Sequence, residues 1–323
     1  MNLRSMPALS SREVTLAAAC LAAILIFWLV SPHFGTVANL STILRNSVEL
    51  LLIGLGMTLL LAMGGIDVSV GVAMGLAAIA VGQVLAGNGP TAAAALAGPL
   101  TGAALGIITA SVVVLGRIPP IVATLGLFGV FRTAIFLWLG GQWLSGLPTD
   151  LTALVSTHIL GVPLTAWIIA AAYLATWFAL RRTPFGPHLL AIGNSEAKAR
   201  LSGISVRKVQ FSAFVISGAL CGLAATFYVA TYRNVEMTIG STLALEAIAA
   251  VVLGGTSILG GRCSLVGTVL GVLLIRILQN GLLLVGVPSL WQTVVTGGLL
   301  LAVLCLDAFS GRLSLPVPGR RPA

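Results

Sequence analysis

Apolar residues in this chain form long uninterrupted stretches rather than alternating with polar ones. The 49 residues between Asp67 and Arg117 carry no formal charge, which is more than twice the roughly 20 residues needed by one membrane-spanning helix. Strands of an outer-membrane barrel alternate apolar and polar positions, and runs such as 92–115 do not. The pattern therefore predicts an all-α, polytopic membrane protein.

About ten transmembrane helices are predicted where Gly, Pro and Asn divide the apolar runs. The segment Gly87-Asn88-Gly89-Pro90, for example, is a turn signal inside the uncharged stretch. The predicted spans are 14–31, 46–63, 68–86, 92–115, 121–143, 161–180, 209–230, 242–260, 264–286 and 290–308. We interpret residues 1–323 as a single transmembrane domain.

Composition excludes a soluble enzyme. The chain is 58% hydrophobic and only 8% charged, whereas a soluble domain is typically about 45–50% apolar and about 25% charged. The cysteines at 20, 221, 263 and 305 stand singly, without metal-ligand spacing. We expect them to be packing residues, and we expect no metal and no cofactor in this chain.

The positive charges predict the orientation. With the N-terminus in the cytoplasm, the predicted outside loops hold only Arg45 and Arg233, while Arg132 and Arg276 fall inside spans. The inside positions hold Arg4, Arg12, Arg117, Arg181, Arg182, Lys198, Arg200, Arg207, Lys208, Arg262, Arg312, Arg320 and Arg321. This strong bias predicts that both termini are cytoplasmic. Because the positive charges are explained by the orientation in the membrane, the net charge of +9 does not indicate nucleic-acid binding, and we expect no nucleic-acid partner.

Transport could be driven by ATP hydrolysis in this chain or by coupling to an ion gradient, and the sequence bears on both. A phosphate-binding loop needs Gly-Lys-Ser/Thr, and neither Lys198 nor Lys208 follows a glycine, so we expect no ATP hydrolysis in this chain. An ion-coupled secondary transporter usually needs intramembrane carboxylates. Glu49, Glu246 and Asp67 are the candidates, which leaves that class as the alternative function.

Two glycine-rich breaks interrupt the apolar runs at predicted cytoplasmic ends. Such paired breaks often mark unwound backbone in transporters. Their residues include Gly64, Gly65, Asp67, Ser69 and Gly71 in the first break, and Gly254, Gly255, Gly260 and Gly261 in the second. Tight turns, with Asp67 and Ser257 capping the following helices, are the alternative interpretation.

The longest predicted cytoplasmic loop spans 181–210. Within it, 195–201 is predicted to form a short helix that is capped by Asn194 or Ser195 and stopped by Gly203. On the opposite side, we expect 145–160 to face outward, where it carries no positive charge.

Four motifs occur in a fixed order along almost the whole chain: 64–71, 118–126, 191–194 with 201–206, and 247–261. With them the chain resembles the inner-membrane permeases of bacterial ABC importers for ribose, other monosaccharides and autoinducer-2. Within that family, the segment 121–148 looks most like the permeases of autoinducer-2 importers, and related rhamnose-type permeases share parts of it.

The resemblance implies several partners. A periplasmic binding protein would deliver a sugar-like ligand, a second permease chain (identical or paralogous) would complete the path, and cytoplasmic ATPase subunits would drive transport across the bacterial inner membrane. The loop 181–210 would then couple to the ATPase, with a solvated connection as the alternative. Its coupling candidates are Gly193, Asn194, Glu196, Ala197, Leu201 and Gly203.

One position departs from the family. Many relatives carry a Glu before the Ala-Ile-Ala-Ala run of the eighth span, where this chain has Ala244, and its acid is Glu246. A ligand or binding-protein contact at that position is relocated or lost if the usual Glu makes one.

Arg132 is predicted near the middle of the fifth span, where an uncompensated charge is costly. We expect Glu49 or Glu246 to be its counter-charge, either as a wall of the translocation path or as a structural ion pair. Other candidates for the outer mouth of the path are Trp138, Gln142, Trp143, Asn280, Trp291 and Gln292. The tryptophans equally fit interface anchors.

Overall fold

The computed structural model describes residues 11–288, 291, 294–295, 297–298 and 301. The first nine predicted spans each correspond to a helix, whereas most of the tenth, 290–308, lies outside the described residues. The main helices are α1 (Ser11–Val30), α2 (Val37–Ala62), α3 (Val70–Ala86), α4 (Thr91–Ala110, continued by a π-helical turn at Ser111–Leu115), α5 (Pro120–Leu139), α7 (Leu164–Arg182), α10 (Val206–Tyr232), α11 (Leu243–Leu253) and α12 (Leu265–Leu284).

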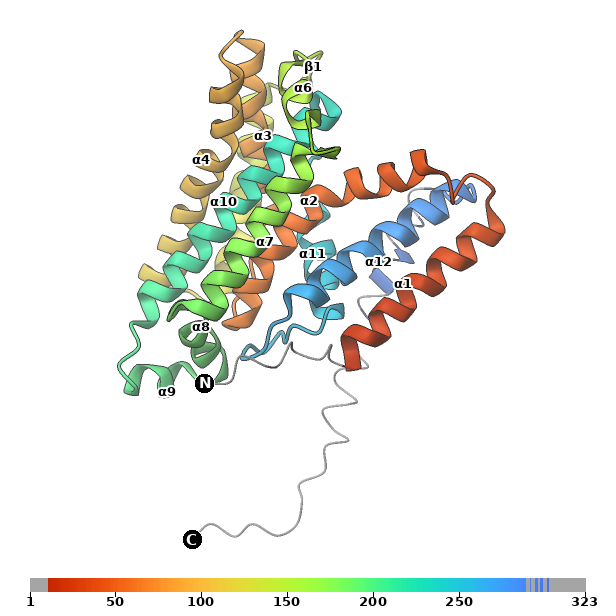
Figure 1. Cartoon of the computed structure of the whole chain (residues 1–323). Coiled ribbons are helices and arrows are strands. Elements are labelled where there is room, and N and C mark those ends of the chain that lie inside the picture. Colours follow the sequence, from red (N-terminus) through yellow and green to blue (C-terminus); the bar gives the residue numbers. More distant parts are fainter. Residues whose placement is uncertain (1–10, 289–290, 292–293, 296, 299–300, 302–323) are drawn as a thin grey trace.

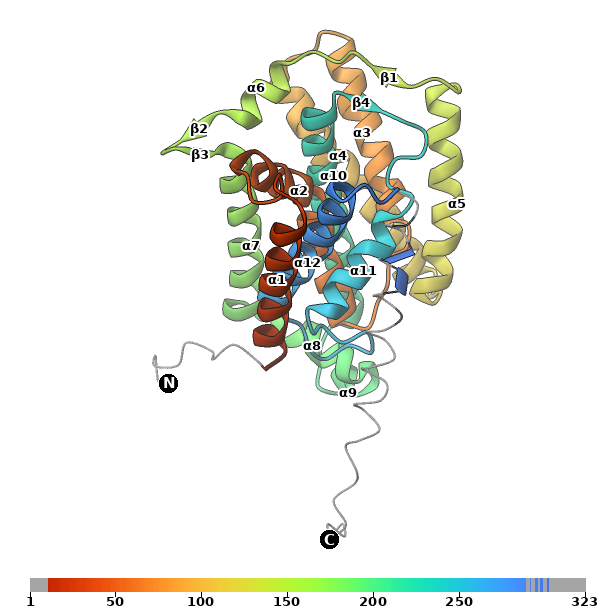
Figure 2. The same cartoon turned by 90° about the vertical axis from the view of Figure 1, so that its right-hand side faces the viewer.

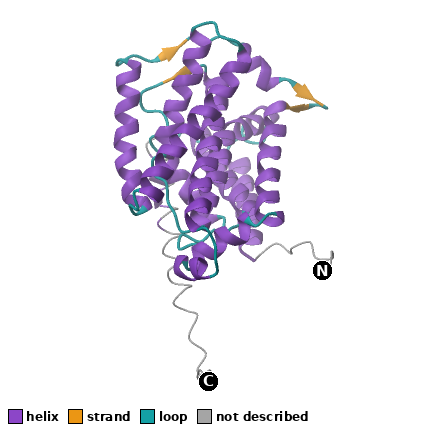
Figure 3. Cartoon of the chain, turned by 90° about the vertical axis from the view of Figure 1, so that its left-hand side faces the viewer, coloured by secondary structure: helices purple, strands orange, loops and turns teal. Residues whose placement is uncertain are grey.

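Short elements mark the two ends of the helical bundle. At one end lie α6 (Asp150–Ser156), the pair β1 (Leu144–Ser145) with β4 (Asn234–Val235), and the hairpin β2 (His158–Ile159) with β3 (Val162–Pro163). At the other end lie α8 (Phe185–Asn194) and α9 (Glu196–Leu201) (Figures 2 and 3). We call these the strand end and the α8–α9 end.

Seven of the described helices are long and apolar enough to cross a membrane, while α3 and α11 are shorter. At 1.5 Å per residue, the 11 residues of α11 extend about 16 Å, roughly half of a bilayer core. The chain is thus an all-α membrane protein. The total of about ten spans and the cytoplasmic location of both termini stay predictions.

The helices form two groups that share α2. In the first group, α10 packs against α4, α3 and α2. In the second, α12 packs against α1, α11 and α2 (Figure 1). Because α2 belongs to both groups, it is the most buried of the candidate spans, with 78% of its apolar window inside the protein.

Glycines bring α4 and α10 into backbone contact. A Cβ on Gly102 would collide with Gly218 and Gly222, and a Cβ on Gly222 would collide with Gly98 and Gly102. The fourfold spacing Gly98-Gly102-Gly106 faces Gly218-Gly222, which is the small-residue pattern that allows close helix approach in membranes. We call this contact the glycine seam; the spacing of its glycines is already present in the sequence.

Two predicted span boundaries were wrong, and one predicted loop contains an additional helix. The second span begins at Val37 rather than 46, because Thr36 caps the helix by accepting a hydrogen bond from the Asn39 backbone N–H (3.2 Å). The eighth ends at Leu253 rather than 260, where the glycine-rich segment starts. The loop 181–210 contains α8 in addition to the predicted short helix.

Candidate functional site

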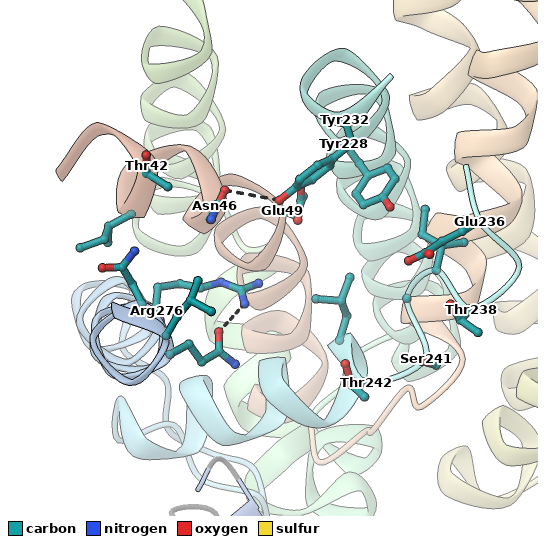
Figure 4. Close-up of a pocket in the computed structure, with 17 residues that line it drawn as sticks. Thr42, Asn46, Glu49, Tyr228, Tyr232, Glu236, Thr238, Ser241, Thr242 and Arg276 are labelled. Atoms are coloured by element: carbon teal, nitrogen blue, oxygen red, sulfur yellow. Dashed lines mark hydrogen bonds between the residues drawn. The ribbon is translucent and has the colours of Figure 1, made fainter. Parts of the chain in front are cut away.

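A cavity of about 470 Å³ opens between α2, α10, α11 and α12, near the strand end of the bundle (Figure 4). This volume lies within the usual range for sites that hold small molecules. It is lined by Thr42, Ile43, Asn46, Glu49, Tyr228, Tyr232, Glu236, Thr238, Ile239, Gly240, Ser241, Thr242, Leu243, Arg276, Gln279, Asn280 and Leu283. Most of these side chains are polar, which is unusual inside a chain this apolar.

The cavity exists because α11 is short. Between β4 and α11, residues 236–242 form a series of turns in which Ile239 and Ser241 donate backbone hydrogen bonds to Glu236 and Thr238. This turn segment lies against the start of α3, where Gly71 and Gly240 meet backbone to backbone. Non-helical backbone at membrane depth is stable only where protein covers it or where it lines a polar cavity, and here both conditions hold.

An ion pair joins Arg276, which lines the cavity, to Glu246 of α11. The Arg276 Nη1 atom donates to Glu246 Oε2 (3.1 Å) and to Gln279 Oε1 (2.6 Å). Both charged side chains are 14% exposed. Glu49, on α2, is only 6% exposed and lies close enough to feel the charges of Arg276 and Glu246. Glu246 also accepts a hydrogen bond from Thr242 (3.1 Å), the residue before α11.

A second group of lining residues was not found by reasoning from the sequence. Tyr228 lies near Glu236 and Glu49, and Tyr232 donates to Asn46 Oδ1 (3.4 Å) (Figure 4). Nothing in the sequence separates these tyrosines from ordinary interface anchors. In the described part of the chain, no three His, Cys, Asp or Glu side chains gather as a metal site.

The predicted site residues divide into two sets. Glu49 and Asn280 line the cavity, Glu246 is bound to its lining residue Arg276, and Asn280 exchanges two amide hydrogen bonds with Asn39 of α2 (2.9 and 3.0 Å). Three others, Trp138, Gln142 and Trp143, are exposed at the end of α5 and in the loop that follows it, and they do not line the cavity. Trp291 is also exposed, and Gln292 lies outside the described residues.

The expected partner of Arg132 was wrong. Its guanidinium lies over the ring of Phe136, 5.7 Å from the centroid, one helical turn along α5. Glu246 pairs with Arg276 instead. Among the described residues, no carboxylate forms an ion pair with Arg132. The sequence did not indicate the pairing of Glu246 with Arg276. Arg276 comes 30 residues after Glu246, and the two meet only because α11 packs on α12.

The two glycine breaks meet at the α8–α9 end. The Gly261 N–H donates to the carbonyl of Ala62, the last residue of α2 (2.9 Å). A Cβ on Gly193, in α8, would collide with both Ala62 and Gly261, and Gly260 packs on Gly193 in turn. The coupling candidate Asn194 lies directly beside Gly261. We call this contact of three segments the break junction.

The tight-turn interpretation assigned Asp67 and Ser257 as caps of the helices that follow the two breaks. Asp67 Oδ1 accepts from the backbone N–H (2.8 Å) and the hydroxyl (2.6 Å) of Ser69, just before α3. Burial raises the pKa of the Asp67 carboxyl, and the Ser69 hydrogen bonds act in the opposite direction. At the second break the cap of α12 is Ser264, which accepts from Gly267 N–H (2.9 Å), and not Ser257.

Positive φ angles fix the second break. Gly255, Gly260 and Gly261 have φ of +93°, +90° and +78°, and Gly64 in the first break has +79°. Residues with a Cβ rarely adopt these angles. Gly65 and Gly254 are not among the positive-φ glycines. Gly254 is required for another reason, since a Cβ there would collide with Gly267 of α12.

The short helix predicted within the loop 181–210 is present as α9. Ser195 Oγ caps α9 by accepting from Lys198 N–H (3.3 Å), and Gly203 ends it with φ +80°. Glu196 forms an exposed pair with Arg200 (2.6 Å), whereas Leu201 packs on little of the protein. Exposed Leu201 next to charged neighbours leaves an amphipathic surface at the α8–α9 end.

Comparison with known proteins decides the family. Residues 39–304 match the family model described as "Branched-chain amino acid transport system / permease component". The chain belongs to this family. Members of this family are transport permeases.

Three curated relatives cover most of the chain. It is 39% identical to the autoinducer 2 import system permease protein LsrC of Klebsiella pneumoniae over 305 residues, 94% of this chain and 88% of the relative. It is 36% identical to the ribose import permease protein RbsC of Escherichia coli over 283 residues (86% and 88%). With RbsC of Bacillus subtilis it shares 37% identity over 287 residues (88% and 89%).

Proposed function

We propose that this chain forms the translocation path of a binding-protein-dependent ABC importer, and that it carries a sugar-like ligand across the bacterial inner membrane. Autoinducer-2 and monosaccharides such as ribose or rhamnose are the ligands that the relatives and the resemblance favour. The observation that carries the proposal is the polar cavity beside the shortened helix α11. Transporters commonly bind substrate where a helix is broken inside the membrane.

The chemistry of the cavity suits a polyhydroxylated ligand. Carboxylates such as Glu49 and Glu236 accept hydrogen bonds from hydroxyl groups, and the amides of Asn46 and Asn280 both donate and accept. The Tyr228 ring adds a flat apolar surface. Such a lining replaces the water around a small sugar without requiring it to be charged.

The energy for import would come from separate ATPase subunits. The break junction supports this part of the proposal, because α8 contacts the end of α2 and the second break at once. A force on α8 would therefore reach the helices that enclose the cavity. Family membership favours this arrangement over an ion-coupled secondary transporter.

Reconstituted vesicles test the import function. The chain, its ATPase subunits, a second permease chain and the binding protein are assembled in liposomes, and uptake of labelled ribose and autoinducer-2 is measured. We expect uptake that requires ATP and not a proton gradient. Uptake driven by the proton gradient alone would contradict the proposal and restore the ion-coupled alternative.

Orientation is tested with a matched pair of positions. Leu160, in the β2–β3 hairpin, and Leu201, at the end of α9, are both 89% exposed and lie at opposite ends of the bundle. In intact cells, an impermeant thiol reagent should label Leu160→Cys and spare Leu201→Cys. The reverse labelling would invert the predicted topology.

The same pair tests coupling. Leu201→Asp should weaken retention of the ATPase subunit when the complex is purified, because it places a charge on the exposed apolar position of α9. Leu160→Asp, with the same change at the strand end, should leave retention unchanged. Equal retention by both variants would show that α9 is not the docking element.

A further inference from the structure

The charges that line the cavity do not balance. Two carboxylates, Glu49 and Glu236, line it together with one guanidinium, Arg276. Arg276 is already paired with Glu246, which lies in the first turn of α11. Glu49 and Glu236 therefore have no cation of their own among the lining residues. Arg45 lies near Tyr232, but it is exposed and does not line the cavity.

The N-terminus of α11 is a further source of positive potential beside these carboxylates. This end faces the cavity through Ser241, Thr242 and Leu243, and a helix N-terminus carries roughly half a positive charge. Glu246 stands in the first turn of α11 and is held there by Thr242. A full carboxylate thus already occupies the favourable position at this helix N-terminus.

We infer that Glu49 and Glu236 make the cavity selective: it admits uncharged polyhydroxylated molecules of monosaccharide size and rejects anions such as sugar phosphates and sugar acids. This inference rests on the proposed function, because it names the ligand class of that path. An uncharged hydroxyl donates a hydrogen bond to a carboxylate, whereas an anion in the same place is repelled in a partly buried, low-dielectric site.

The two glutamates differ in position, which gives the selectivity two stages. Glu236 lies on the turn segment 236–242 after β4, near the strand end, and is half-buried. Glu49 lies on α2 and is almost fully buried. Tyr228, which also lines the cavity, lies near both carboxylates.

The charge of the cavity is measured with thiol reagents of opposite sign. Thr238→Cys is introduced beside Glu236 in a chain whose native cysteines are replaced by serine, and the complex is treated with a trimethylammonium or a sulfonate methanethiosulfonate. Leu160→Cys, exposed at the strand end, corrects for the intrinsic difference between the reagents. We expect the cation-to-anion rate ratio at 238 to exceed that at 160 by about tenfold.

Neutral variants assign the effect to residues. Glu49→Gln and Glu236→Gln should each lower the ratio, and the double variant should bring it to the value at Leu160→Cys. Glu196→Gln, on α9 at the opposite end, is the matched control and should change nothing. If Glu49→Gln does not fold, Glu236→Gln alone decides, because it lies on the turn segment. Equal ratios at 238 and 160, or a ratio that survives the double variant, would overturn the inference.

The outcome is independent of the import function, since no transported ligand is needed for labelling. A complex that fails to import ribose but keeps the tenfold ratio contradicts the proposed function and supports the charge selectivity. A complex that imports ribose, but whose ratio at 238 equals that at 160, supports the proposed function and contradicts the charge selectivity.

Discussion

The helix α10 has two faces that behave in opposite ways. Toward α4 it presents Gly218 and Gly222, and the two backbones touch along the glycine seam. In its last turns it presents Tyr228 and Tyr232 to α2 and α12, and the helices stand apart around the cavity. One helix is therefore fixed on one side and bounded by a polar space on another.

The two faces of α10 show how side-chain size decides which helices of a membrane protein can move relative to each other. Lipid is as apolar as leucine, so helices in a membrane associate by close van der Waals packing and by hydrogen bonds rather than by a hydrophobic driving force. Glycines supply the close packing at the seam. Large polar side chains prevent it at the cavity and keep space for a ligand. We expect relative motion between the two helix groups, with the α4–α10 unit moving as one body.

Removing the ion pair beside the cavity should have the largest effect on stability. Arg276→Ala leaves Glu246 and Glu49 without their shared cation, and removal of one partner from a buried pair costs about 3–5 kcal/mol. Unfolding of the purified chain in mixed micelles measures the loss. The double variant with Glu246→Ala should recover part of it, since one carboxylate is then removed as well.

The matched control for this prediction is Arg132→Ala. This arginine also lies within a span, but it contacts the Phe136 ring, and we expect a cost of only about 0.5–1 kcal/mol. A loss at Arg132 as large as that at Arg276 would contradict the assignment of the ion pair.

Breaking the glycine seam should come next. Gly222→Ala places a methyl group against the backbone of Gly98 and Gly102, and overpacking of this kind typically costs about 1–3 kcal/mol. In Gly126→Ala, on α5, the added methyl group has no atom within 4 Å. That control should be neutral or stabilised by up to about 1 kcal/mol, because alanine favours helix. Similar melting of both variants would mean that the seam is not tight.

The smallest effect on stability is expected from two threonine substitutions in the pair of helices α2 and α12. Below the cavity, α2 and α12 are joined by the buried hydroxyls of Thr58 and Thr268, 2.7 Å apart. Thr268→Val should cost about 0.5–1.5 kcal/mol, because that hydrogen bond is lost. Thr42→Val, exposed at the cavity on α2, should stay within about 0.5 kcal/mol of the unmodified chain. Equal effects would show that the lower contact does not hold these helices together.

Local signals in the sequence predicted local structure well. Hydropathy predicted nine of the helices, and most of their first and last residues lie within a few positions of the prediction. The capping residue Ser195 and the terminating residue Gly203 correctly predicted α9. The boundaries that failed depended on distant residues or on competing caps. The second span, for example, begins at a cap provided by Thr36, upstream of a stretch interrupted by Arg45.

The candidate site was predicted only in part. Glu49 and Glu246 stood out because a carboxylate in an apolar run is conspicuous at any position. Glu236 and Tyr228 were missed as members of the site, since each looks ordinary among its sequence neighbours. Arg276 was located inside a span but was not assigned to the site. Their significance comes from α10, α11 and α12 converging on one cavity.

The sequence by itself determined the membrane environment, the helical segments, the glycine breaks and, through its motifs, the permease family. These properties follow from solvent and backbone, because a chain that is 58% hydrophobic must bury its peptide groups in helices. Only the tertiary structure decided which charges meet. Arg276 rather than Arg132 pairs with Glu246, and Gly193 joins Ala62 to Gly261. Such contacts span 30 to more than 100 positions of the chain, and hydropathy carries no information about which helix lies beside which.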